Sequence, residues 1–255
     1  MEKRQMDFKY YFMKLVIVIL FIFSVAELSS QPTFIYSGRI EFERKTNQHS
    51  DFNGESQWSD EMKKRIPKFV TDVFELVFSG DISIYKLARE NPDNKYMWGS
   101  KPSTTDLVIQ NIGTRQLTIQ REVFEQTYLL QDSLRNLQWR ITEEKREIAG
   151  FDCRKAVTRI CDSVYVVAFY TDQIPVSSGP ESFGNLPGMI LGLAVPRLSI
   201  TWFATRIELT TPSAQNLQPT LRGKKTNWLK YNADLQKAMR DWGKEGASNM
   251  WKFSL

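Results

Sequence analysis

The sequence predicts a mainly β protein of the β-rich α+β class. A single curved antiparallel sheet or half-barrel is accompanied by one short helix and a C-terminal helix. Short stretches that alternate apolar and polar residues recur through most of the chain, and this period of two is typical of half-buried strands. The stretches follow one another without the helices of about 10–15 residues that connect parallel strands. There is no internal repeat, and the length suits one all-β domain of roughly 200–250 residues.

The first 26 residues have the three-part pattern of a secretory signal peptide. Four basic residues fall within the first 14 positions, an apolar run covers 15–23, and Ser24-Val25-Ala26 offers a cleavage site, with a cut after Ser30 as an alternative. The apolar stretch is shorter than the roughly 20 residues of a spanning helix. We therefore predict an exported protein that is not an integral membrane protein after cleavage. Residues 27–255 would form its single domain.

The formal net charge of +5 is spread along the chain. Nucleic-acid binding requires basic residues gathered with aromatic residues on one face, and the sequence shows no such cluster. We therefore expect a solvated surface of mixed charge and no nucleic-acid partner.

The first half of the chain is predicted to contain a strand, a short helix and three hairpins. Residues 36–44 alternate cleanly between an apolar and a polar face, which predicts a half-buried strand. A capping sequence at Ser59-Asp60-Glu61 predicts a short helix at 62–66, ended by Pro67. Turn residues between alternating segments predict the hairpins. Their paired segments are 72–78 with 82–87, 106–110 with 115–124, and 128–130 with 134–142.

The second half is predicted to continue the sheet and to end in a helix. The charge run at 143–147 is interpreted as a solvated turn. The segment 164–170 is apolar on both faces, so we expect it to be the most buried strand. A change of phase near Thr205-Arg206 predicts a β-bulge. The expected strands are 151–160, 164–170 and 198–209, and the expected helix is 228–242.

The two cysteines, Cys153 and Cys161, are predicted to be unbridged. On one extended strand their separation of eight residues corresponds to roughly 26 Å, whereas a disulfide needs Cα atoms within about 7 Å. The residues between them include no Gly, Pro, Asn or Asp to turn the chain.

The sequence does not predict a catalytic residue, a metal site or a cofactor. The single histidine, His49, lies in a polar loop, so no imidazole is placed for a catalytic triad. Two alternatives stay open: a pair of carboxylates could act as general acid and base, and Met189 or Cys153 could bind copper or heme. The carboxylates concerned are Asp172, Glu181, Asp152 and Asp162.

The most distinctive stretch is 172–197, which holds four of the 13 glycines and four of the 10 prolines. Pro187 fixes its own φ and Gly188 allows a positive φ, so Leu186 to Met189 fits a type II turn. We interpret the stretch first as a structural turn that returns apolar residues to the core, with a ligand site as the alternative.

This stretch resembles the signature of the GLPGLI family, a group of exported proteins from Bacteroidetes-type bacteria. The six residues from Asn185 are Asn-Leu-Pro-Gly-Met-Ile. Asn185 replaces the first glycine of the motif, and Met189 replaces its second leucine. The surroundings agree in order: Gly-Phe-Asp-Cys-Arg-Lys-Ala from Gly150, then Ala-Phe-Tyr-Thr-Asp from Ala168. The candidate residues for binding or for a structural turn are Gly179, Pro180, Phe183, Leu186, Pro187, Gly188, Met189 and Ile190.

The resemblance implies an envelope protein, periplasmic or associated with the outer membrane, with no established biochemical activity and an association with outer-membrane transport systems. We therefore predict a non-enzymatic accessory or binding module. Its partner would be an envelope or outer-membrane transport protein, or an apolar small ligand, and no cofactor is expected. The alternatives are a carboxylate-dependent hydrolase and a copper- or heme-linked envelope factor.

Overall fold

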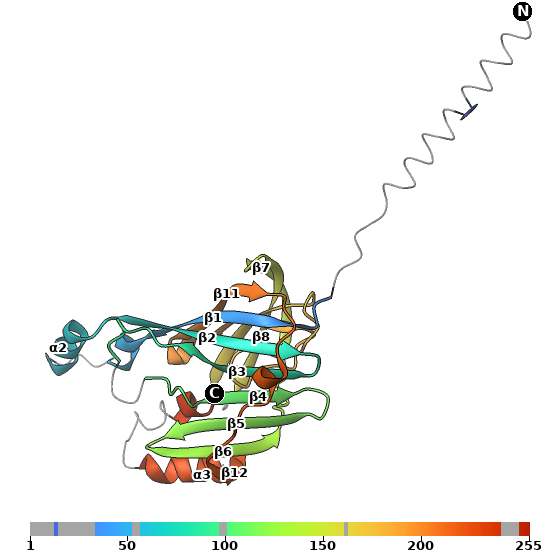
Figure 1. Ribbon diagram of the computed structural model, residues 1–255. Helices are drawn as coiled ribbons and strands as arrows, with labels where there is room; N and C mark the ends of the chain where they lie inside the picture. The colour runs from blue at the N-terminus through green and yellow to red at the C-terminus, as the bar shows by residue number, and fades with distance from the viewer. Residues whose placement is uncertain (1–12, 15–33, 53–56, 97–100, 161–162, 241–249) are drawn as a thin grey trace, which may run out of the picture. The chain divides into compact units, whose positions relative to one another are not determined.

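The structure is a computed structural model that describes residues 13–14, 34–52, 57–96, 101–160, 163–240 and 250–255 (Figure 1). The chain divides into two units, Met1–Thr33 and Phe34–Leu255. The predicted signal peptide belongs to the first unit and lies almost wholly outside the described residues. Within the part of the chain that is described, no helix has the length and apolarity to cross a membrane.

The second unit is mostly β structure, as predicted, and its strands form one open, curled sheet (Figure 1). The strand order is β12-β6-β5-β4-β3-β2-β1-β11-β10-β9-β8-β7. The strands are β1 (Ser37–Asn47), β2 (Phe69–Ser79), β3 (Ile82–Arg89), β4 (Leu107–Asn111), β5 (Gln116–Val123), β6 (Gln126–Ser133), β7 (Arg140–Ile148), β8 (Phe151–Ile160), β9 (Val164–Thr171), β10 (Met189–Val195), β11 (Ile200–Glu208) and β12 (Lys224–Thr226).

Two antiparallel meanders, β1 to β6 and β7 to β11, make up this sheet. They join where β1 pairs with β11. The short strand β12 adds to β6 and is parallel to it. The pairing is otherwise antiparallel among the described strands, as the succession of strands without connecting helices predicted.

Both predicted helices are present. α2 (Gln57–Arg65) ends before Pro67, and α3 (Trp228–Ala238) begins after Asn227, whose side chain accepts a hydrogen bond from the amide of Lys230. α3 buries Tyr231 and Leu235, and Tyr231 packs edge-on against Tyr128 of β6. Three short 3-10 helices are η1 (Gln48–Asp51), η2 (Pro196–Leu198) and η3 (Ala214–Leu217).

The predicted bulge in β11 is confirmed. The pairing with β1 passes from Glu41 opposite Arg206 to Phe42 opposite Ala204, so Thr205 has no partner in the ladder. Trp202 and Ala204 are buried on one side of the bulge, and Ile207 on the other side is partly buried against the core.

One predicted hairpin is wrong. β6 ends at Ser133, and 134–139 then leads to β7, which forms the opposite edge of the sheet from β12 and β6 (Figure 1). The apolar residues of 134–139 pack against the core instead of pairing with β6, and the Trp139 indole donates to the carbonyl of Gly184 at 2.9 Å. The charge run 143–147 is also not a turn: it lies in β7, where charged side chains protect an exposed edge strand from pairing with other chains.

We expected 164–170, which forms most of β9, to be the most buried strand. The structure shows instead that β10 is the most buried strand. Tyr165 of β9 is exposed, whereas every residue of β10 except Ala194 is buried. β10 lies between β9 and β11 and carries the apolar half of the Gly/Pro-rich stretch into the core.

Candidate functional site

The residues 172–188, which we call the inner segment, connect β9 to β10 along the buried face of the sheet. Strands of the other meander hold it. The hydroxyls of Ser178 and Ser83 (β3) are 2.6 Å apart, and the Gln110 amide (β4) donates to the carbonyls of Glu181 and Phe183 at 3.3 and 3.2 Å. The inner segment therefore links the two meanders across the interior of the curled sheet.

Most of the candidate motif residues are buried together where the inner segment meets β10. A Cβ atom at Gly179 would lie 2.6 Å from the Cβ of Ile190, so this contact requires a residue without a side chain at position 179. Pro187 is the exposed member. The buried members are Gly179, Pro180, Phe183, Leu186, Gly188, Met189 and Ile190.

The turn in the motif is tighter than the predicted type II turn. The amide of Gly188 donates to the carbonyl of Leu186 at 2.7 Å, while the amide of Met189 donates to Ile174 at 2.9 Å. Gly188 is required here because a Cβ would lie 2.0 Å from the carbonyl oxygen of Thr171. Asn185 adopts a φ of 66°, a left-handed conformation that Asn tolerates better than most residues.

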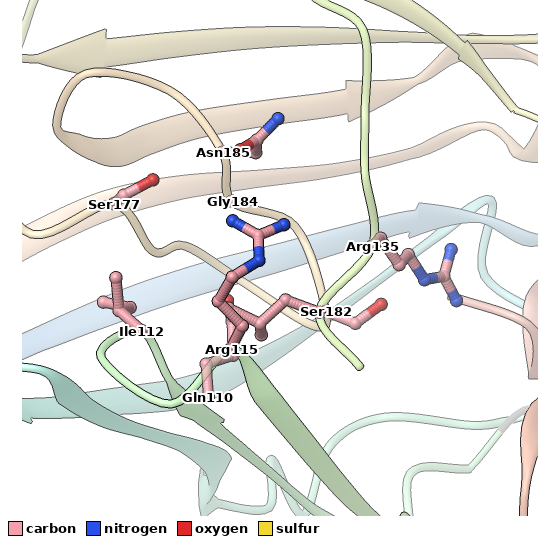
Figure 2. A pocket seen from close by; sticks show the side chains of 9 residues that line it. Gln110, Ile112, Arg115, Arg135, Ser177, Ser182, Gly184 and Asn185 are labelled. Carbon is pink, nitrogen blue, oxygen red and sulfur yellow. The ribbon is translucent and has the colours of Figure 1, made fainter. Parts of the chain in front are cut away.

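A small polar pocket lies beside the inner segment (Figure 2). Its volume is about 60 Å³, and Ser177, Ser182, Gly184 and Asn185 of the inner segment line it together with Arg115 and others. This volume holds a few water molecules. It is well below the roughly 300 Å³ at which small-molecule sites begin.

A larger cavity, which we call the inner cavity, has a volume of about 710 Å³. Its walls come from the buried face of β1 to β5 and β11, from Glu181 of the inner segment, from the loop 101–106 and from 252–255. The volume falls within the range of about 300–1,000 Å³ that is usual for small-molecule sites. We take the inner cavity as the candidate functional site.

A buried charge cluster forms one wall of the inner cavity. Arg121 on β5 donates to the Glu181 carboxylate at 2.8 Å, and its Nε lies 3.9 Å from the carboxylate of Asp106. Burial raises the pKa of Asp106 to about 6, although Arg121 opposes this shift. Burial alone would lower the pKa of Arg121. Glu181 and the other neighbours of Arg121 outweigh this effect, so the pKa of Arg121 is raised overall. Glu181 holds a φ of 55°, a strained conformation for this residue type.

An aromatic wall and a second ion pair form the other side of the cavity. The rings of Phe74 and Tyr85 stack at a centroid distance of 5.1 Å, and the Arg44 guanidinium lies 4.6 Å from the centre of Phe74. Arg44 donates to the fully buried carboxylate of Asp72 at 3.0 Å. Trp202 completes the wall from β11, directly opposite Arg44 in the ladder.

The carboxylates proposed from sequence do not converge on one site. Asp172 and Asp152 are exposed, Asp162 lies outside the described residues, and only Glu181 lines the inner cavity. His49 is part of η1, where its Nε2 lies 3.1 Å from the carbonyl of Ile66.

The sulfur atoms proposed as metal ligands are both in the core. Met189 and Cys153 are fully buried, and burial raises the pKa of the Cys153 thiol to about 12. Cys153 forms no disulfide, and Cys161 lies outside the described residues. Among the residues that the structure covers, no three His, Cys, Asp or Glu side chains are grouped to hold a metal ion.

Sequence reasoning missed the polar residues of the inner cavity, although the alternation of the strands contains a signal for them. Arg121 follows the buried residues Leu117 and Ile119 in phase, and Arg44 follows Ile40 and Phe42 in phase. A charged residue at an inward position is costly unless it is paired. Such residues therefore mark places where the interior is polar or open.

Comparisons with known proteins support the fold and leave the activity open. A family model described as a protein of unknown function (Porph_ging) matches residues 158–192, which include β9 and the inner segment. The family model that matches this stretch does not carry the GLPGLI name that the motif led us to expect. No curated protein matches the chain.

Two solved structures share the β-rich fold. Two crystal structures of PNGF-II align with TM-scores of 0.52 and 0.51, each at 15% sequence identity, over 77% and 78% of this chain. The chain spans about a third of the PNGF-II length, since the alignments cover 32% of it. An uncharacterized conserved protein from Thermus thermophilus aligns over 74% of this chain and 90% of its own length, with a TM-score of 0.37 and 5% identity.

Proposed function

We propose that this chain is a non-enzymatic binding module of the cell envelope that holds a small molecule in the inner cavity. The supporting observation is the cavity of about 710 Å³ inside the curled sheet. Apolar and aromatic side chains cover much of its wall, and a few polar groups converge on it, which is typical of small-molecule sites. Its apolar residues include Phe74, Leu107, Val108, Val123, Ile200 and Trp202.

The envelope location is part of the proposal and rests on the sequence. The basic, apolar and small-residue succession of residues 1–26 favours export with cleavage after Ala26, or after Ser30 as the alternative. The motif resemblance favours a role beside an outer-membrane transport system. In this proposal the mature chain presents its ligand to, or receives it from, an envelope partner.

The second candidate is a carboxylate-dependent hydrolase. The observation that favours it is the position of Asp106 and Glu181 in one cavity, with the pKa of Asp106 raised to about 6. However, Glu181 is engaged by Arg121 in a buried ion pair. No observation favours the copper- or heme-linked alternative, because Met189 and Cys153 lie within the core.

Titration with N-phenyl-1-naphthylamine, a neutral apolar dye whose fluorescence rises in apolar surroundings, tests the proposal. We expect saturable binding by the mature chain. A Thr104→Trp variant, which places a large side chain at an exposed residue lining the cavity, should lose most of this binding. A Thr210→Trp variant on an exposed site away from the cavity should retain it.

Equal dye binding by Thr104→Trp and Thr210→Trp would contradict a site in the inner cavity. The mass of the chain recovered from a periplasmic fraction tests the export part separately. We expect a mature N-terminus at Glu27, or at Gln31 if the later site is cut. Recovery of the full-length chain from the cytoplasm would contradict it.

A further inference from the structure

Four polar atoms of residues that line the inner cavity are buried and have no hydrogen-bond partner among the described residues. They are Arg44 Nε, Tyr85 Oη, Arg121 Nε and Trp202 Nε1. All four carry a hydrogen that can be donated. Buried donors without an acceptor are uncommon in folded proteins, and each is unfavourable because its lost hydration is not replaced. Their occurrence at one cavity therefore requires an explanation.

Two of these donors lie at one point of the aromatic wall. The side chains of Tyr85 and Trp202 are 3% and 1% exposed. The Trp202 indole N–H faces the Tyr85 hydroxyl closely enough to lower the pKa of Tyr85, yet neither atom has a hydrogen bond of ordinary geometry to a described residue. Burial, followed by the charge of Glu181, outweighs this effect and raises the pKa of Tyr85 well above its ordinary value, so the phenol keeps its proton and remains a donor.

Each guanidinium group donates to one acid and keeps one N–H without a hydrogen bond. Asp106 lies 3.9 Å from Arg121 Nε, which is beyond hydrogen-bond distance. Arg44 bonds to Asp72 through Nη2, and Arg121 bonds to Glu181 through Nη2. In both residues Nε is the atom that lacks an acceptor at hydrogen-bond distance among the described residues. The charge of each arginine is thus fixed in place, while one buried N–H of a residue that lines the cavity keeps no acceptor.

We propose, as a deepening of the function proposed above, that the inner cavity binds small organic carboxylates with an aromatic or apolar body. Because all four unsatisfied atoms are donors, the ligand must supply oxygen acceptors. A carboxylate accepts at about four lone-pair positions and can serve several donors at once, including guanidinium N–H groups. The stacked Phe74 and Tyr85 rings, with Ile200 and Val108, would hold the apolar body.

Three matched probes test this assignment by isothermal titration: 3-phenylpropionate, 3-phenylpropionamide and 3-phenylpropylamine. We expect the acid to bind at least tenfold more tightly than the amide and the amine. Tyr85→Phe removes only the hydroxyl and should weaken binding of the acid by about tenfold, the usual effect of one hydrogen bond to a charged group. Tyr165→Phe, on an exposed site, should leave the affinity unchanged.

Thermal unfolding of the same variants separates loss of a contact from loss of structure. Because the Tyr85 hydroxyl has no partner among the described residues of the free protein, Tyr85→Phe should unfold at the same temperature as the parent or higher. Trp202→Phe, which removes the second donor, should also weaken binding of the acid by about tenfold.

Equal binding of the three probes, or unchanged affinity for the acid in both variants, would overturn the carboxylate assignment. Failure of all three probes to bind would overturn it as well. If the neutral dye still binds in the cavity and is lost in Thr104→Trp, the proposed binding function stands while this inference fails. If the dye does not bind either, both fail.

Discussion

Arg121 lies between two acidic side chains at the wall of the inner cavity, and its surroundings account for several properties of the site. The side chains of Arg121 and Glu181 are 12% and 8% exposed, so their ion pair is largely removed from water. Breaking a buried pair by removing one partner leaves an uncompensated charge, which is far more destabilising than breaking an exposed pair.

The variant Glu181→Gln should therefore lower the free energy of unfolding by about 3 kcal/mol. The matched control is Glu144→Gln, which removes an ion pair to Lys155 from a side chain that is 56% exposed. For this control we expect a change within about 1 kcal/mol. Chemical denaturation at pH 7 measures the free energy of unfolding of both variants. Equal losses would contradict a larger stabilising contribution from the buried ion pair of Arg121 and Glu181.

Asp106 predicts a dependence of stability on pH. Its pKa is about 6 in the folded state and 3.8 as the ordinary value, so the folded state binds more protons between these two values. The contribution of Asp106 to stability is then full below about pH 4 and is lost as the pH rises through about 6, by up to about 3 kcal/mol. Denaturation at a series of pH values should show this fall in the parent and in the exposed control Asp152→Asn, and not in Asp106→Asn. A fall that persists in Asp106→Asn would assign it to another group.

At the scale of elements, the inner segment and β10 determine where the cavity lies. The segment is tied to β3, β4 and β5 by side chains that face the interior of the sheet, and it brings Glu181 to Arg121. Its return into β10 depends on the close approach of Gly188 to the carbonyl of Thr171. The geometry of this turn therefore controls both the core and the site.

Gly188→Ala tests this dependence. A Cβ atom 2.0 Å from the Thr171 oxygen forces the backbone to move, and we expect a loss of about 3 kcal/mol in the free energy of unfolding. Gly80→Ala is the control, because Gly80 also has a positive φ but a Cβ there would meet nothing within 4 Å. Its expected loss is about 1 kcal/mol, from backbone conformation alone. Equal losses would mean that the close approach is unimportant.

Most elements could be predicted from local pattern, because alternation and turn residues act within a few positions of each other. Even the bulge at Thr205 was visible, since it shifts the phase of the alternation. The false hairpin arose because 134–139 also alternates, although its apolar residues pack against the core and the Trp139 indole bonds to Gly184. No local pattern distinguishes an extended core segment from a strand, because the partner lies about 45 residues away.

The candidate site was less predictable for the same reason. The motif residues 185–190 were conspicuous in the sequence, yet the structure places most of them in the core. Arg44, Tyr85, Arg121 and Trp202 come from four different strands, and only the curl of the sheet brings them to one cavity. The phase of Arg44 and Arg121 indicates that they face inward, but it does not indicate that they face the same space.

At the scale of the whole second unit, two meanders joined at β1 and β11 enclose the inner segment and leave the inner cavity beside it. The inner segment fills one part of the interior of the curled sheet, and the inner cavity leaves another part open. Such an interior suits a module that binds a ligand without large rearrangement. In the proposed function, a bound ligand would supply the acceptors for buried donors that the described part of the protein does not satisfy.

The most direct test of this account is the proton resonance of the Trp202 indole during titration with 3-phenylpropionate. The chain has seven tryptophans, and comparison with Trp202→Phe identifies the signal. We predict that the Trp202 indole resonance moves downfield as its N–H gains an acceptor, and that it saturates with the dissociation constant measured by calorimetry. A Trp202 resonance that stays in place while the acid binds, or while no binding is detected, would contradict a carboxylate site in the inner cavity.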